Sequence, residues 1–446
     1  MMHWKHWRPA AALFMTMATG AAVHAQDAPE TLFRDVRVFD GQSDRLSPPT
    51  NVAVKGNVIT AIGPAAKAGA GARVIEGRGR TLMPGLIDVH VHLTFGALDM
   101  AKLMSPDLTP QAAEAAAADQ AKAMLLRGFT AVRDMGGPVF GLKAGIDRGK
   151  YQGPRIWPSG AVISQTSGHG DFRLPTERSR RFFGKPSRAE ELGATFIADG
   201  RDEVLAATRE NLRFGASQIK LMAGGGSSSD YDPIDVTQYL PEELSAAVAA
   251  AEDWGTYVAV HAYTSRAVRR ALDAGVKSIE HGQLLDEATI KLIADRGAWL
   301  SLQNLPPPLP NDPPDRVAKK MAVREGSDHA WNWAKKYHVK LAWGTDFLFR
   351  PEENREQNAY ILRLKQWFTP AEILRMVTHD NAQLLALSGE RAPYKGKLGV
   401  VEAGALADLI LVNGDPLANI DLIGDPDRNF AVVMKDGVIY RADGVK

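Results

Sequence analysis

Short apolar runs alternate with Ala-rich stretches between residues 88 and 390, and this alternation constrains the fold more than any other feature. Helical patterns such as PQAAEAAAADQAKAMLLRG and PEELSAAVAAAEDWG separate most of the runs. Repeated strand–helix units form a parallel sheet, and eight units close into a barrel. The sequence therefore predicts an α/β protein built on a (β/α)8 TIM barrel. We count eight strand-like runs, at residues 88–93, 130–136, 155–160, 218–223, 257–263, 278–282, 299–304 and 340–347.

Strand and turn signals also occur at both ends of the chain. Residues 26–87 contain DVRVFDG and VAVKGNVITAIG, and residues 391–446 contain GALADLILVNGDP and FAVVMKDGVIYRADG. Such β-rich runs between Gly and Pro breaks are typical of strands, but neither segment is long enough to bury a core alone. We expect the two segments to form one small composite β-sandwich beside a catalytic barrel of residues 88–390.

The first 25 residues have the pattern of a secretory signal peptide. Lys5 and Arg8 give a basic start, residues 9–23 are small and apolar, and VHA precedes Gln26. We expect cleavage near Ala25 and a secreted or periplasmic protein. The apolar run is shorter than the roughly 20 residues of a spanning helix, and no later run is longer, so we expect no membrane span.

Composition limits the chemistry and the partners. The 446 residues include no cysteine, which excludes disulfides, thiolate ligands and a cysteine nucleophile. The formal net charge is +1, which gives no electrostatic reason to expect a nucleic-acid partner. Because cysteine is absent, any metal must be held by nitrogen and oxygen ligands.

Histidine and aspartate residues fall at the ends of the predicted barrel strands. His90 and His92 form a His-x-His pair on the first strand, and period-2 geometry points both side chains to one face. His261, His281 and Asp346 end the fifth, sixth and eighth strands. Strand ends of a barrel meet at one rim, where barrel enzymes place their active sites. This ligand set predicts a Zn²⁺ site, with Mn²⁺, Co²⁺ or Fe²⁺ as alternatives.

Lys220 lies on the fourth predicted strand, in QIKLMA, and faces the same interior. A free ammonium group among histidines and metal cations would be repelled. A lysine amine can react with CO2 to give an anionic carbamate that bridges two metals, and this is the form we expect. The alternative is a lysine that forms a salt bridge inside the barrel.

Five segments of the chain resemble the metal-dependent amidohydrolase superfamily with a two-metal centre: MPGLIDVHVHL, QIKLMAGGG, VAVHAY, SIEHG and WGTDF. The resemblance runs from about residue 31 to the C-terminus. Within the superfamily the chain is most similar to binuclear zinc dipeptidases and carboxypeptidases of the Xaa-Pro dipeptidase-like, imidazolonepropionase-related group. It is also similar to ochratoxin-hydrolysing amidohydrolases. The phrases GFTAVRDMGG, GPRIWPSG, SQTSGHGD and IEHG point to that group.

The resemblance implies a role for each of these residues. His90, His92 and Asp346 would hold the more buried metal, His261 and His281 would hold the outer metal, and carboxylated Lys220 would bridge the two.

A hydroxide bridging the two metals would be the nucleophile. Asp346 would take its proton on attack and pass that proton to the leaving nitrogen. His169, in SGHGD, is expected to hydrogen-bond the substrate carbonyl or the oxyanion. Tyr263 is expected to bind a substrate carboxylate, with packing at the barrel mouth as the alternative.

We therefore expect an enzyme that hydrolyses an amide or peptide bond and releases a C-terminal amino acid. A dipeptide or an N-acyl amino acid would be the substrate, and ochratoxin-type amides belong to that class. One alternative is a cyclic amidase or deaminase such as an imidazolonepropionase-like hydrolase. Another is an exported metal- or ligand-binding protein without catalysis. The resemblance also implies a homo-oligomer, although no residue pattern establishes it.

Overall fold

The computed structural model describes residues 29–304 and 307–445. The expected signal peptide, residues 1–25, lies outside this part of the chain. Within the described ranges, no helix combines the length and the apolar character needed to cross a membrane.

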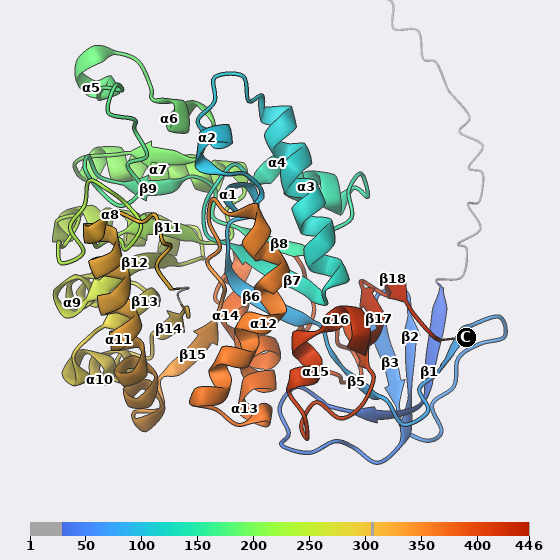
Figure 1. Ribbon diagram of the computed structural model, residues 1–446. Coiled ribbons are helices and arrows are strands. Elements are labelled where there is room, and N and C mark those ends of the chain that lie inside the picture. The colour runs from blue at the N-terminus through green and yellow to red at the C-terminus, as the bar shows by residue number, and fades with distance from the viewer. Residues whose placement is uncertain (1–28, 305–306, 446) are drawn as a thin grey trace, which may run out of the picture.

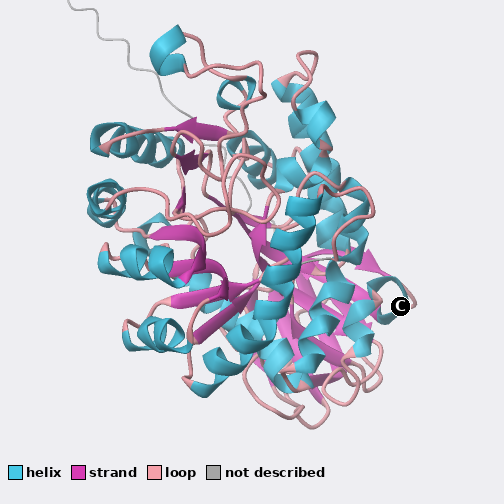
Figure 2. Cartoon of the chain, turned by 60° about the vertical axis from the view of Figure 1, so that its left-hand side comes forward, coloured by secondary structure: helices cyan, strands magenta, loops and turns pink. Residues whose placement is uncertain are grey.

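Parallel strands form the centre of the fold, and helices flank them (Figures 1 and 2). Each of the eight predicted segments contains or overlaps one of these strands. Their residues are almost entirely buried, as expected for a parallel sheet covered by helices. In chain order the strands are β6 (Leu86–Val91), β7 (Phe129–Asp134), β8 (Arg155–Pro158), β11 (Ile219–Met222), β12 (Val258–Thr264), β13 (Ser278–Leu284), β14 (Trp299–Leu302) and β15 (Lys340–Trp343).

The third barrel strand is interrupted, which the sequence did not predict. β8 pairs with β7, whereas β9 (Val162–Ser164) continues the same stretch and pairs with β11. Gly160 lies in the break with a φ of 78°, a left-handed conformation that favours glycine. A further short strand, β10 (Thr195–Ile197), pairs with β9 and lies between the third and fourth predicted strand runs.

The first and last barrel strands are joined at the ends that carry candidate ligands. The backbone N–H of Asp346 donates to the carbonyl of His90 across 2.8 Å. The Thr345 hydroxyl donates to the buried carboxylate of Asp88 at 2.7 Å, and that carboxylate also accepts from Gln357 at 3.0 Å. These contacts bring the ends of β6 and β15 together.

Several helices begin with capping groups that the sequence encodes. Thr109 accepts from the Ala112 N–H at 3.1 Å, and Pro110 occupies the first turn, where its missing N–H costs nothing. Thr369 and Glu372 form a reciprocal capping box. The helices and helical turns that follow the barrel strands are α1 (Leu93–Ala97), α2 (Met100–Leu103), α3 (Pro110–Leu126), α4 (Phe140–Asp147), α5 (Arg180–Phe183), α6 (Arg188–Glu191), α7 (Arg201–Phe214), α8 (Pro241–Asp253), α9 (Ser265–Asp273), α10 (Glu287–Asp295), α11 (Pro314–Lys336), α12 (Gln357–Ile361), α13 (Pro370–Arg375) and α14 (Asn381–Ala386).

Both ends of the chain contribute to an eight-stranded sheet beside the barrel (Figure 1). The two ends meet where β5 pairs antiparallel with β16, with Leu82 opposite Leu411. A separate apolar core, which includes both residues, lies within this β-structure. The strands are β1 (Glu30–Val38), β2 (Thr50–Lys55), β3 (Val58–Ile62), β4 (Arg73–Glu76), β5 (Thr81–Pro84), β16 (Leu409–Val412), β17 (Phe430–Lys435) and β18 (Val438–Ala442), and α15 (Asp421–Gly424) and α16 (Pro426–Asn429) precede β17.

A buried ion pair connects the N-terminal end of the barrel to this sheet. Nε of Arg155, at the start of β8, lies 2.9 Å from the Asp408 carboxylate, and its Nη2 lies 2.6 Å from Asp436. The Arg155 and Asp408 side chains are 6% and 2% exposed, so the contact is shielded from solvent. The predicted histidine and aspartate ligands lie at the opposite, C-terminal ends of the strands.

Candidate metal centre

Three predicted ligands form a compact group at the C-terminal end of the barrel. Nε2 of His90 lies 3.4 Å from Oδ1 of Asp346, and Nε2 of His92 lies 3.2 Å from the same oxygen. One ligand atom from each residue lies within 4.8 Å of the others. Both imidazoles are buried and the Asp346 side chain is only 11% exposed. The His-x-His spacing on β6 therefore does place two nitrogens on one face, as the sequence predicted.

Two of the site residues adopt a left-handed backbone conformation. His281 has a φ of 78° and Asp346 a φ of 57°, which is uncommon for residues other than glycine. Strict alternation along β13 points Glu280 into the barrel, and the positive φ turns the next side chain, His281, towards the site as well. Nδ1 of His281 then lies 4.0 Å from Oδ2 of Asp346. Backbone conformations of this kind are frequent at functional sites, where they set the direction of a side chain.

His261 lies on the other side of His281. Its ring centroid is 4.3 Å from that of His281 and 3.9 Å from that of His169, which it stacks against at 20°. Nε2 of His261 lies 3.0 Å from the carbonyl oxygen of Gly225. The structure thus brings all four predicted histidine ligands into one cluster, but His261 is not within ligand distance of the His90, His92 and Asp346 group.

Burial holds several of the imidazoles in their neutral form. It lowers the pKa of His90 and of His261 well below the usual range, and it lowers the pKa of His281 to about 3. Burial opposes ionisation of Asp346, but its histidine neighbours outweigh that effect and hold the pKa of the carboxyl below its usual range. Neutral imidazoles and an ionised carboxylate are the forms that bind metal ions.

Lys220 is buried in the same cluster, at 1% exposure on β11. Burial lowers the pKa of its amine from 10.5 to about 8, although the carboxylates of Glu280 and Asp346 oppose the shift. The amine is therefore still mainly protonated near neutral pH, but its uncharged fraction is far larger than that of an ordinary lysine.

A buried network beneath the histidines escaped the sequence analysis. Oε2 of Glu280 lies 2.9 Å from Nδ1 of His90, and its Oε1 accepts from Arg133 at 2.7 Å and from Ser278 at 2.6 Å. Arg133 also donates to the Tyr257 hydroxyl at 3.0 Å. The IEHG segment carried a usable signal, because Glu280 alternates with Ser278 on the interior face of β13. Arg133 gave no comparable signal, since its partners come from distant strands.

His169 and Tyr263, the predicted substrate-contacting residues, both border the cluster. Nδ1 of His169 lies 2.9 Å from the Ser229 hydroxyl and 3.3 Å from the Asp232 carboxylate. The Tyr263 ring lies 5.1 Å from that of His261, and its hydroxyl is 3.3 Å from that of Ser227. Burial raises the pKa of the Tyr263 phenol, so its hydroxyl keeps its proton near neutral pH. The three contacting residues, Ser227, Ser229 and Asp232, lie in the Gly-rich segment 224–233, which follows β11.

The donor set fits a divalent metal ion. Imidazole nitrogens and one carboxylate, without thiolates, are the ligands that zinc and similar ions accept in catalytic sites. Nδ1 of His281 is buried and has no hydrogen-bond partner, although it points towards Asp346. Orphaned buried nitrogens are rare, and a bound ion is one of the few arrangements that satisfies them. The residues present therefore match the group that they were predicted to hold.

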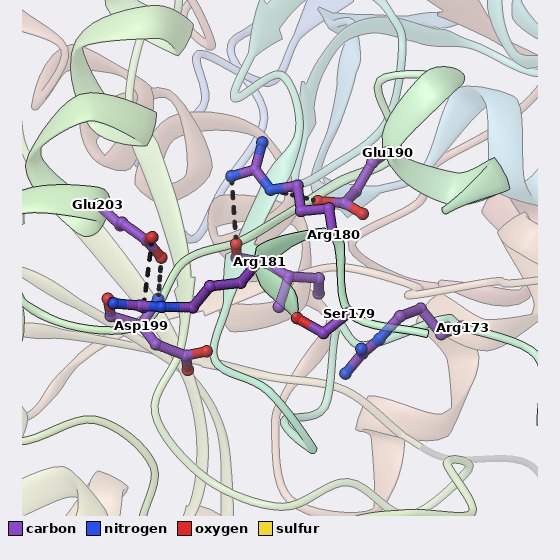
Figure 3. A pocket seen from close by; sticks show the side chains of 8 residues that line it. Arg173, Ser179, Arg180, Arg181, Glu190, Asp199 and Glu203 are labelled. Atoms are coloured by element: carbon purple, nitrogen blue, oxygen red, sulfur yellow. Dashed lines mark hydrogen bonds and ion pairs between the residues drawn. The ribbon is translucent and has the colours of Figure 1, made fainter. Parts of the chain in front are cut away.

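A surface hollow lies elsewhere, beneath helix α5 (Figure 3). It has a volume of only about 70 Å³ and is lined mainly by charged side chains that already have partners. Arg180 pairs with Glu190 at 3.2 Å, and Arg181 pairs with Glu203 at 3.3 Å. The lining contains equal numbers of acidic and basic side chains and none of the predicted metal ligands. This hollow is therefore separate from the candidate metal centre.

Comparison with known proteins identifies the family of the chain. Residues 81–440 match the model of the Amidohydrolase family. The ochratoxinase of Aspergillus niger is 32% identical over 378 residues, which are 82% of this chain and 76% of that protein. A crystal structure of a prolidase complexed with N-methylphosphonate-L-proline superposes with a TM-score of 0.84 at 33% identity, covering 93% of this chain and 100% of the other. A Xaa-Pro dipeptidase with methionine in its active site gives a TM-score of 0.78 at 29% identity, with the same coverage. The chain belongs to the amidohydrolase family.

Proposed function

We propose that this protein hydrolyses an amide or peptide bond and releases a free C-terminal amino acid, with two divalent metal ions, most simply zinc, as cofactors. The observation that carries the proposal is the convergence of four histidines, Asp346 and Lys220 at one end of the barrel. The similarity to a prolidase and to ochratoxinase supports cleavage of an acyl–nitrogen bond next to a free carboxylate.

The structure suggests how the ligands would divide. His90, His92 and Asp346 would hold one ion, because their ligand atoms already lie together. His261 and His281 would hold the other, since their rings are adjacent. When bound, such ions activate water and polarise a carbonyl oxygen.

Lys220 would supply the bridge between the two ions as a carbamate. Its uncharged amine would add to the carbon of CO2, forming a nitrogen–carbon bond as one carbon–oxygen π bond breaks. The amine proton would pass to water, leaving an anionic carbamate with two oxygens. The pKa of about 8 supports this step, because it leaves free amine available. The carbamate would also replace the buried positive charge of a protonated Lys220 with a negative charge. A negative charge beside the histidines would favour the binding of metal cations.

Asp346 is the group that can move a proton. Its carboxylate is ionised near neutral pH, and it lies within 3.4 Å of ring nitrogens from two histidines. Water attacking the substrate carbonyl must lose a proton, and the leaving nitrogen must gain one. A single carboxylate at the point of attack can carry that proton from one to the other.

His169 and Tyr263 would bind the substrate. The His169 ring stacks on His261, and a nitrogen at that position can donate to the developing oxyanion. Tyr263 keeps its phenol proton, so its hydroxyl can donate to the substrate carboxylate. The Ser227 hydroxyl, 3.3 Å away, lies beside it.

The test is an assay of the purified protein against N-acyl amino acids, including N-acyl-phenylalanine, and Xaa-Pro dipeptides. Release of free amino acid is measured after chelation and after reloading with Zn²⁺, alongside the metal content of the protein. We expect release that chelation abolishes and zinc restores. Ring opening of lactams or imidazolones without amino-acid release would favour a cyclic amidase. Bound metal without turnover of any of these compounds would favour a binding protein.

A further inference from the structure

A carboxylate that no sequence pattern singled out lies against the ring of His169. Oδ2 of Asp232 is 3.3 Å from Nδ1 of His169, and the Asp232 side chain has no exposed surface. Its second oxygen, Oδ1, is buried without a hydrogen-bond partner. Burying a carboxylate is costly unless a charged or donating group faces it, so this placement requires a reason.

The neighbours of Asp232 keep it against the imidazole. The Gly226 N–H donates to Oδ2 across 2.6 Å, and the Ser229 hydroxyl lies 2.9 Å from the same Nδ1 of His169. Hydrogen bonds from His169, Ser229 and Gly226 outweigh the burial of Asp232 and hold the pKa of its carboxyl below the usual range. The Asp232 carboxylate is therefore ionised and can accept hydrogen bonds from Nδ1–H of His169 and from the Ser229 hydroxyl.

Gly226 closes the other side of the imidazole. A Cβ added at this glycine would overlap the His169 ring, so the backbone of the loop packs directly on the imidazole. The ring face stacks on His261, and the backbone N–H of His169 donates to Gln238 at 3.1 Å. The ring edge, the ring face and the backbone of His169 are all in contact with neighbours. These contacts hold the imidazole in one orientation.

Helix α11 fixes the loop that carries the carboxylate. The ammonium group of Lys319 donates to the backbone carbonyls of Ser229 and Asp232, each at 3.0 Å. Arg316 from the same helix pairs with Asp230 at 2.5 Å. The position of Asp232 thus depends on the scaffold and not on the loop alone.

We propose that Asp232 is a positioning residue that acts through His169. Nδ1–H of His169 donates to the Asp232 carboxylate, which fixes the ring with Nε2 directed at the substrate. The carboxylate also stabilises the imidazolium form of the ring, whose Nε2–H donates to the substrate carbonyl oxygen. This role rests on the proposed function, since it requires that His169 contacts the reacting group. A carboxylate that orients a catalytic imidazole in this way changes its geometry and tautomer, not the binding of the remainder of the substrate.

A double-mutant cycle tests the proposal. The variants Asp232→Asn, His169→Asn and the double variant are assayed with the substrate that the parent enzyme turns over best, at equal metal content. We expect Asp232→Asn to lower kcat by about 10- to 100-fold with little change in KM. The double variant should be no slower than His169→Asn alone, because the carboxylate has nothing left to position. Asp235→Asn is the matched control, since it is three residues away, exposed and not among the contacts that hold the loop, and it should behave like the parent.

If the fold-losses of kcat in the two single variants multiply in the double variant, the proposal is overturned. A kcat of Asp232→Asn close to that of the parent would also overturn it. A second measurement needs neither turnover nor the Asp232 variant. In metal-free protein labelled with ¹⁵N-histidine, the His169 ring, assigned by its absence in His169→Asn, should carry its proton on Nδ1. A bare Nδ1 would refute the positioning role even if the Asp232→Asn variant failed to fold. If the parent enzyme cleaves no substrate, the proposed function fails, and that result is separate from either outcome here.

Discussion

Nδ1 of His90 lies 2.9 Å from Oε2 of Glu280, while Nε2 of the same ring faces Asp346 at 3.4 Å. One edge of the imidazole is thus committed to a carboxylate, and the other edge presents its lone pair to the candidate metal. Arg133 in turn holds Glu280, so the orientation of a ligand at the end of β6 depends on two residues from β7 and β13.

Glu280→Gln should weaken metal binding. A glutamine in this place still fills the volume, but it loses the charge that makes His90 a better donor to a cation. We expect metal affinity to fall about 10- to 100-fold, as measured by competition with a chelator. Glu287→Gln, an exposed glutamate paired with Lys336, serves as the control and should bind metal like the parent. Equal affinity in both variants would show that Glu280 does not tune His90.

The same substitution should make stability less dependent on pH. Burial raises the pKa of Glu280, but Arg133, Lys220 and Ser278 outweigh that effect and keep it below 4.5. A lowered folded-state pKa contributes stability that is fully present above the unfolded value and is lost as pH falls through the folded value. Metal-free parent should therefore exceed Glu280→Gln in unfolding free energy at neutral pH. The difference should shrink progressively below pH 4.5, as followed by urea denaturation. A difference that stays constant through that range would contradict the assignment.

Asp346→Asn should abolish most of the turnover while leaving the fold intact. An amide can still touch a metal ion, but it cannot accept and return a proton. We expect kcat to fall by about 10²- to 10⁴-fold. Steady-state kinetics at matched metal content, together with circular dichroism, would check this. Turnover close to that of the parent would remove Asp346 from the mechanism.

Gly226→Ala should disturb the His169 ring. The new methyl group would overlap the imidazole, so the ring or the loop must move. Gly224→Ala is a closely matched control, because a Cβ there meets its nearest neighbours at 3.5 to 3.6 Å, an ordinary contact distance. We expect a large loss of kcat in the first variant and parental kinetics in the second. Crystal structures of both would show whether the ring has shifted.

Asp408→Asn should destabilise the contact between the barrel and the β-structure. Breaking a buried ion pair costs about 3–5 kcal/mol, and the lower end applies here because Asp436 still faces Arg155. Denaturant titration would measure the loss. Asp202→Asn removes one partner of an exposed pair and should leave the unfolding free energy unchanged. Equal stability of the two variants would show that the buried pair contributes little.

The sequence predicted features that depend on local pattern and period. The barrel strands followed from alternating apolar runs, and the His90–His92 pair followed from the period of a strand. The convergence of the histidines followed from barrel geometry, but individual contacts between other side chains from distant segments were missed. Arg133 meets Glu280 across 147 positions of sequence, and Asp232 meets His169 only because a loop folds back over the site. β10 was missed because three residues are too few to show a period.

The pairing of β5 with β16 places one of the first strands to leave the ribosome beside one of the last. Until Leu411 arrives opposite Leu82, the early strands present an open hydrogen-bonding edge to any other extended chain. Contacts between such remote positions close slowly, because a long loop must be ordered before they form. Loss of the segment from β16 onwards would therefore expose the unpaired edge of β5, which could then pair with other chains and aggregate. Every residue of the histidine cluster would still be present in the chain.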